Sequence, residues 1–243
     1  MAHFRSNCAF AFSSVLIGLC AAAYGAPEPS PVPTSWELTL EPSPPLRIQV
    51  EEHGAKTTYW YMLYTVTNNT GQDIDFHPEI VRVNEIESEL PADKVETQSE
   101  LAPKVTVDPA IVGVPSRLFE AIAKRHAKTH PFLVTPVSSI GRLLQGKDNA
   151  RTGVAVFPDL DPRVSRFTIY FGGLSGEVMT RPNPLHKAPA VGAMANGHQA
   201  DQDANPPLFV LRKTLMIPYT LPGDARTRGS ATPVLGRMTW VMR

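Results

Sequence analysis

Imidazole side chains are the groups in this chain best suited to bind zinc or copper. His126 and His130 are four residues apart, a spacing that places two imidazoles on one face of a helix. However, His130 and His77 each precede a proline, which disfavours helical geometry at the preceding residue. No glutamate lies between His126 and His130 as in a His-Glu-x-x-His site. We therefore predict ordinary surface or capping histidines and no cofactor, and His77, His126 and His130 are kept as candidate ligands for an alternative, metal-binding function.

Carboxylates and one serine are the other groups that could do chemistry. A carbohydrate-active enzyme needs two carboxylates brought together in space. Asp159 and Asp161 are close in sequence, but with Pro162 beside them they are more typical of a turn. Ser175 lies in Gly-Leu-Ser-Gly-Glu, which lacks the last glycine of a Gly-x-Ser-x-Gly elbow, so we expect a hairpin loop. The sequence predicts a protein that is not an enzyme, and a carbohydrate-active enzyme is the second alternative.

The charge pattern gives no basis for nucleic-acid binding. The 23 basic and 23 acidic residues of the 243-residue chain cancel, and nucleic-acid affinity depends on excess positive charge. Four cations gather on or near a predicted helix: Arg117, Lys124, Arg125 and Lys128. The aromatic residues lie mainly in predicted core strands, so no stacking platform accompanies these cations. We expect no nucleic-acid partner, and an envelope protein or a polysaccharide is the partner class that we retain.

The first 25 residues are typical of a secretory signal. Arg5 precedes an uncharged apolar run over residues 9–19, which is shorter than the roughly 20 residues of a membrane-spanning helix. Ala23 and Gly25 provide the small residues that cleavage after Gly25 requires. We expect an exported protein, periplasmic or extracellular, with no transmembrane segment once the signal is removed.

Both cysteines of the chain lie inside this predicted signal. Cys20 could instead be a lipoprotein acylation site, but the bulky Leu19 before it departs from the small residue of that pattern. Removal of Cys8 and Cys20 leaves a mature chain with no disulfide, no thiolate metal ligand and no cysteine nucleophile. The mature protein must therefore be held together by its apolar core.

The rest of the chain predicts strand after strand. Alternate prolines over residues 26–34 indicate an extended spacer. The run from Tyr59 to Val66 is apolar or aromatic on both faces, which predicts a central strand covered on both sides. The other expected strands lie near residues 36–40, 46–50, 74–83, 104–107, 152–157, 166–171, 208–217 and 237–241. Residues 181–207 hold five prolines and no aromatic residue, so we expect a flexible loop there.

Two helices are expected to interrupt the strands. Apolar residues recur at helical spacing over residues 117–127 and again over residues 135–144. We expect both helices to form one insertion, about residues 115–146, that lies over a sheet edge or at the mouth of the sandwich. Ile74 and Phe76 fall on even positions but Val81 and Val83 on odd ones, so we expect a bulge or kink at Pro78.

The strand over residues 57–67 and its turn, Asn68-Asn69-Thr70-Gly71, resemble the Ig-like sandwich domains of exported bacterial proteins of uncharacterised function. Gly153-Val154-Ala155-Val156-Phe157-Pro158 is similar to a second strand of such domains, although its proline follows the phenylalanine directly. The resemblance implies a mainly β fold, an Ig-like antiparallel β-sandwich over residues 35–243, and it brings no catalytic residues. Because the chain combines strong framework segments with no convergent catalytic motif, we expect an exported, non-enzymatic structural or binding module of the cell envelope or extracellular space.

Overall fold

The computed structural model describes residues 27–52, 54–86, 104–184, 186 and 206–243. The predicted signal peptide, the proposed acylation site at Cys20 and most of the loop predicted over residues 181–207 lie outside the described residues. In the described part the chain is mainly β, with antiparallel sheets, as the strand pattern predicted.

Two sheets contain most of the strands. The first is built around β3, which pairs with β8 along one edge and with β1 and β2 along the other. Its strands are β1 (Thr39–Pro42), β2 (Leu46–Glu52), β3 (Ala55–Thr67) and β8 (Arg151–Pro158). The second sheet has the order β10-β11-β9-β5-β6, with β12 and β13 also paired to β11. Its strands are β5 (Glu79–Ile86), β6 (Lys104–Pro109), β9 (Val164–Gly172), β10 (Val178–Pro182), β11 (Leu208–Thr220), β12 (Val234–Leu235) and β13 (Thr239–Met242).

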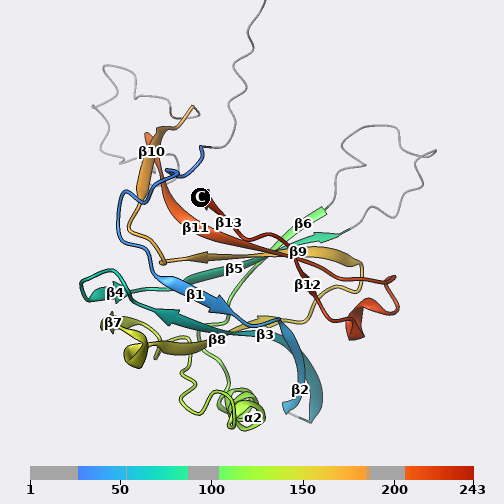
Figure 1. The fold of residues 1–243 in the computed structure, drawn as a ribbon. Coiled ribbons are helices and arrows are strands. Elements are labelled where there is room, and N and C mark those ends of the chain that lie inside the picture. Colours follow the sequence, from blue (N-terminus) through green and yellow to red (C-terminus); the bar gives the residue numbers. More distant parts are fainter. Residues whose placement is uncertain (1–26, 53, 87–103, 185, 187–205) are drawn as a thin grey trace, which may run out of the picture.

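The remaining elements are short. Strands β4 (Ile74–Phe76) and β7 (Gly141–Leu143) form a separate pair beside the first sheet (Figure 1). The described helices are α2 (Ser116–His126) and two 3-10 turns, η2 (Lys147–Asn149) and η4 (Arg228–Ser230). Within the described ranges, no helix has the length and apolar character needed to cross a membrane.

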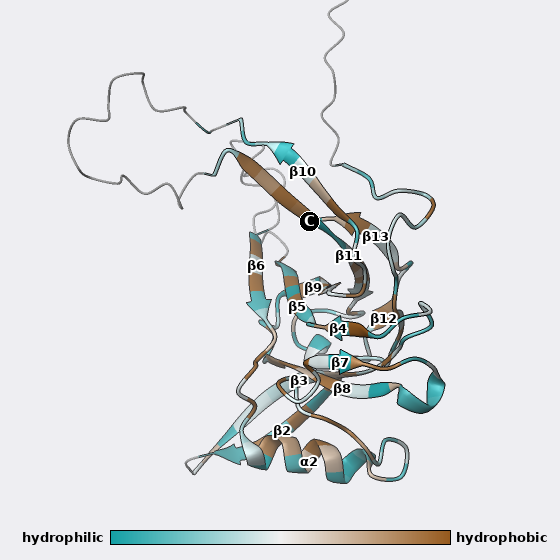
Figure 2. Cartoon of the chain, turned by 90° about the vertical axis from the view of Figure 1, so that its left-hand side faces the viewer, coloured by the Kyte–Doolittle hydropathy of each residue, from teal (hydrophilic) through white to brown (hydrophobic). Residues whose placement is uncertain are grey.

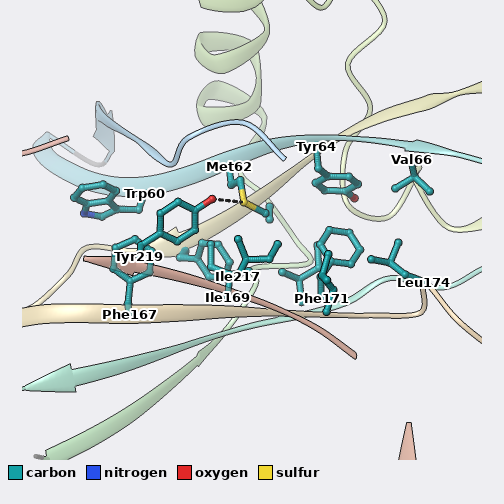
Figure 3. Packing of buried hydrophobic residues seen from close by; sticks show 14 of the residues in the cluster. Trp60, Met62, Tyr64, Val66, Phe167, Ile169, Phe171, Leu174, Ile217 and Tyr219 are labelled. Atoms are coloured by element: carbon teal, nitrogen blue, oxygen red, sulfur yellow. Dashed lines mark hydrogen bonds between the residues drawn. The ribbon is translucent and has the colours of Figure 1, made fainter. Parts of the chain in front are cut away.

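The two sheets face each other across the larger apolar cluster (Figures 1 and 3). Trp60, Met62, Tyr64 and Val66 point from β3 toward β9 and β11 (Figure 3). The rings of Tyr64 and Phe171 meet edge to face, with centroids 4.9 Å apart, a geometry that aromatic pairs prefer. This cluster fixes the separation of the sheets, because it fills the space between them with large rings.

A second apolar cluster lies on the opposite face of β3. Tyr61 and Leu63, which alternate with the residues of the first cluster, pack with Leu118 and Ile122 of α2. The prediction that this strand is covered on both sides is therefore confirmed, since the side chain of Tyr61 is fully buried. Helix α2 covers the outer face of the first sheet and does not lie over an edge or a mouth, which corrects the placement expected for it (Figure 1).

The prediction of a second helix over residues 135–144 is wrong. The chain makes a single turn in which Ser139 N–H donates to Thr135 O, and it then extends into β7 to pair with β4. Val137, Ile140 and Leu144 are 45–55% exposed, so their helical spacing does not correspond to a buried face. Pairing with a strand more than 60 residues away in the chain overrides the local pattern.

The change of inward parity expected at Pro78 does not occur, so there is no bulge, although the strand is interrupted there. The chain passes at this proline from β4 to β5, which belong to different sheets. The even-numbered residues of both strands are buried, so Arg82 and Asn84 point inward on β5 while Val81 and Val83 lie on the outer face. The sequence misleads here because β5 has apolar residues on its outer face and polar ones inside.

The glycine-rich segment after β9 interrupts a strand instead of forming a hairpin. Strands β9 and β10 both run antiparallel to β11, so they share a direction, and the loop between them leaves the sheet. This loop pairs with the segment just before β1: Leu38 N–H donates to Leu174 O, and Gly176 N–H donates to Trp36 O. The loop therefore holds the residues that lead into β1 against the second sheet.

Candidate functional sites

Asp159 and Asp161 lie together at one end of the two sheets, in the connection between β8 and β9. They line a hollow of about 130 Å³, whereas small-molecule sites usually have about 300–1,000 Å³. Both carboxylate oxygens of Asp159 are bound: Oδ1 accepts from Trp60 Nε1 at 3.0 Å, and Oδ2 accepts from Arg47 Nη2 at 2.8 Å. Asp159 therefore orients the indole of Trp60 and anchors Arg47.

Asp161 is held in its ionised form. Its side chain pairs with Arg163 at 2.7 Å and also accepts the Arg163 backbone N–H. These contacts lower the pKa of Asp161 to about 2. A glycosidase acid needs a raised pKa, so Asp161 lacks the property that would make it a proton donor at neutral pH.

The structure brings two of the three candidate histidines together. His126 ends α2, and its ring centroid lies 5.9 Å from that of His130. His126 Nε2 is 2.9 Å from the hydroxyl of Tyr61, and burial, then the charges of His130 and Arg125, lower the pKa of His126. His77 is elsewhere, between β4 and β5. The described residues contain no group of three or more histidine, cysteine or acidic side chains placed to hold a metal.

Ser175 has a structural contact of its own. Its hydroxyl oxygen accepts the backbone N–H of Glu177 at 3.1 Å, two residues further along the chain. This contact stabilises the loop that joins β9 to β10.

A buried lysine between two glutamates forms a charged cluster that the sequence reasoning missed. Lys213 of β11 is 3% exposed, and its ammonium group donates to Glu37 and to Glu177, the latter at 3.1 Å. It also lies 5.3 Å from the centre of the Trp240 ring. Burial alone would lower the pKa of Lys213, but its hydrogen bonds to the two glutamates raise it. The alternation of β11 could have indicated this burial, because Lys213 falls on the same odd-numbered, inward positions as Leu215 and Ile217.

This cluster also holds the segment that the alternate prolines predicted to be a spacer. The second oxygen of Glu177, Oε1, accepts the backbone N–H of Ser30 at 2.8 Å. One carboxylate thus binds both the second sheet and the proline-rich segment. Lys213, Glu177 and Ser30 connect three parts of the chain that lie far apart in sequence.

Replacing Glu177 with glutamine is expected to flatten the acid side of the stability profile. The hydrogen bond from Ser30 and the contact with Lys213 hold the pKa of Glu177 below its usual 4.5, against the opposing effect of burial. At this carboxylate the unfolded chain therefore binds more protons than the folded protein once the pH is near 4.5. The free energy of unfolding falls as the pH drops from there through the folded-state pKa. Urea unfolding at several values between about pH 7 and pH 3 measures this slope.

Glu41→Gln is the matched control, since Glu41 is exposed on β1. Its profile should run parallel to that of the unaltered protein. If Glu177→Gln also gave a parallel profile, the carboxylate would not be coupled to folding as described.

A second buried charge lies on β5. The side chain of Arg82 is 1% exposed, and its Nη2 donates to Asp108 Oδ2 at 2.7 Å and to Pro158 O at 2.9 Å. Its guanidinium carbon is 5.1 Å from the centre of the Phe157 ring. Burial lowers the pKa of Arg82, and the contact with Asp108 offsets this only in part. The guanidinium joins β5, β6 and β8, so this charge serves the framework.

Comparison with known proteins finds no match for this chain among protein-family models, curated proteins or solved structures.

Proposed function

We propose that this chain is an exported, non-enzymatic structural or binding module of the cell envelope or extracellular space, with an Ig-like sandwich as its framework. The observation that carries the proposal is how its reactive groups are used. Asp159, Asp161 and Ser175, the groups that the sequence singled out for catalysis, each hold a strand connection or a turn. The buried charges Lys213 and Arg82 likewise bind the framework.

The shape of the described surface supports binding by an extended surface more than by a pocket. A second hollow, on the outer face of the second sheet beside Tyr170 and Arg243, also has about 130 Å³. Exposed apolar side chains lie instead on strands: Val178 of β10 and Leu208, Phe209 and Val210 of β11 are 43–56% exposed. Where such side chains form a contiguous patch, they are typical of contact with another macromolecule.

The test of the non-enzymatic part is a turnover assay on chromogenic glycosides and on envelope polysaccharide. We expect the purified protein and its Asp159→Asn and Asp161→Asn variants to give the same background rate. Turnover that one of these substitutions abolished would overturn the proposal in favour of a carbohydrate-active enzyme.

Metal analysis of the same samples tests the other alternative. A bound equivalent of zinc or copper that is lost in His126→Ala would favour metal binding.

The export part of the proposal makes its own prediction. A fusion of residues 1–35 to a phosphatase that is active only outside the cytoplasm should give active enzyme. Intact-mass measurement of the exported full-length protein should show a chain that begins at Ala26 and does not react with iodoacetamide, because Cys8 and Cys20 have been removed. A retained, alkylated cysteine would contradict cleavage after Gly25, and a lipid mass on Cys20 would show acylation.

A further inference from the structure

Strand β6 is an edge strand, and within the described residues no strand pairs with its outer side. It pairs with β5 from Ile86↔Lys104 to Val81↔Pro109, and no other described strand pairs with it. Figure 2 shows β6 at the margin of the second sheet. Open edges of this kind present unpaired backbone groups and are ready to pair with another strand.

The backbone groups that face outward on β6 follow from its ladder with β5. Ala110 N–H donates to Ile80 O at 2.9 Å, and this pair continues the register of the two strands. Hydrogen-bonded and non-hydrogen-bonded pairs alternate in an antiparallel ladder. The even-numbered residues of β6 therefore bond to β5, and the N–H and C=O groups of Val105 and Val107 point to the open side.

The side chains of this edge are unusual for an unprotected strand. Val105 and Val107 are 54% and 56% exposed, on the outer face of the sheet. They continue an apolar row, because Val107 lies opposite Val83 of β5. Pro109 has no N–H to offer on the open side, so it limits pairing to the residues before it.

We propose that β6 pairs antiparallel with β6 of a second copy of this chain, about a two-fold axis through Thr106. In this register Val105 of each copy lies opposite Val107 of the other. Each of the two Val105–Val107 pairs can exchange two backbone hydrogen bonds, which gives four in total. Lys104 lies opposite Asp108 of the second copy at both ends. The second sheet would then continue across the dimer.

Charge complementarity selects a second copy as the occupant of this edge. Lys104 is exposed, and Asp108 is 25% exposed with only its Oδ2 bound, to Arg82 and Asn84. Opposite charges on directly opposed strand positions stabilise pairing, whereas like charges oppose it. The two-fold axis places a lysine against an aspartate twice, which an unrelated strand would match only by chance. This inference goes beyond the proposed function and does not depend on it.

Sedimentation velocity on the purified protein tests the dimer. We expect a mass that rises from monomer to dimer with concentration, up to about 1 mM, the weak end of measurable association. Val107→Pro removes an N–H on the open side and leaves the ladder with β5 intact, so the dissociation constant should rise at least about tenfold. Val107→Thr keeps the N–H and is the matched control, which should still dimerise.

Lys104→Glu provides a second, independent test. It places like charges opposite each other at both ends of the pairing, so it should also weaken the dimer, and more strongly at low salt. Circular dichroism establishes that each variant is folded. A monomer at every concentration overturns the proposal, as does a dimer unaffected by Val107→Pro. If Val107→Pro fails to fold, an unchanged dissociation constant in Lys104→Glu overturns it.

Discussion

Replacing Asp108 with alanine is expected to reduce the free energy of unfolding by about 3–5 kcal/mol, the usual cost of leaving a buried charge without its partner. Asp108 Oδ2 receives hydrogen bonds from both Arg82 and Asn84, each at 2.7 Å. Without it, the guanidinium of Arg82, whose side chain is 1% exposed, would keep only Pro158 O and the Phe157 ring. Chemical unfolding monitored by circular dichroism measures the loss.

Two further variants show whether the stranded charge causes this loss. Asp73→Ala removes the exposed ion pair with Arg142, whose side chain is 70% exposed, and should cost no more than about 1 kcal/mol. Combining Arg82→Met with Asp108→Ala should recover most of the lost stability, since an apolar side chain often replaces a buried ion without penalty. Equal losses in Asp108→Ala and Asp73→Ala would refute a buried, dependent Arg82.

Gly173→Ala is expected to cost about 3 kcal/mol or more, because strain and a backbone clash add at one position. Gly173 has φ +82°, a conformation that side-chain-bearing residues rarely adopt. A Cβ there would lie 2.2 Å from the carbonyl oxygen of His77, an atom of the backbone that cannot easily move away. Thermal and chemical unfolding both measure the loss.

Gly71→Ala separates the two causes. Gly71 has φ +87°, but a Cβ there would meet nothing within 4 Å. This variant should cost only the conformational part, about 1–2 kcal/mol. If the two alanine variants were equally stable, the close approach of the loop after β9 to His77 would not contribute to folding.

The strands were predictable from sequence where burial follows the apolar pattern. The region of β3 is apolar on both faces and is buried on both, and β9 alternates as its residues do, with Phe167, Ile169 and Phe171 inward. These segments dominate the core, so the mainly β architecture followed from them.

The errors arose where distant partners decide the conformation. Leu143 is fully buried in β7, where it lies opposite Ile74 of β4. The local spacing of apolar residues that predicted a helix gives no information about β4. The two buried charges were missed for the same reason. Lys213 and Arg82 gain their roles from Glu177 and Asp108, which spacing along the chain does not connect to them.

Strand β3 presents the folding chain with a problem of alignment. Because both of its faces are apolar, a misalignment by one residue would exchange the two clusters while keeping nearly as much apolar surface buried. The burial of apolar surface alone therefore favours the native register of β3 only slightly over a register shifted by one residue, which would act as a kinetic trap. Shape supplies the distinction: the ring of Tyr64 lies over Gly153, where any Cβ would come within 2.5 Å of it. The absence of a side chain at Gly153 of β8 thereby fixes the position of Tyr64, and with it the register of β3.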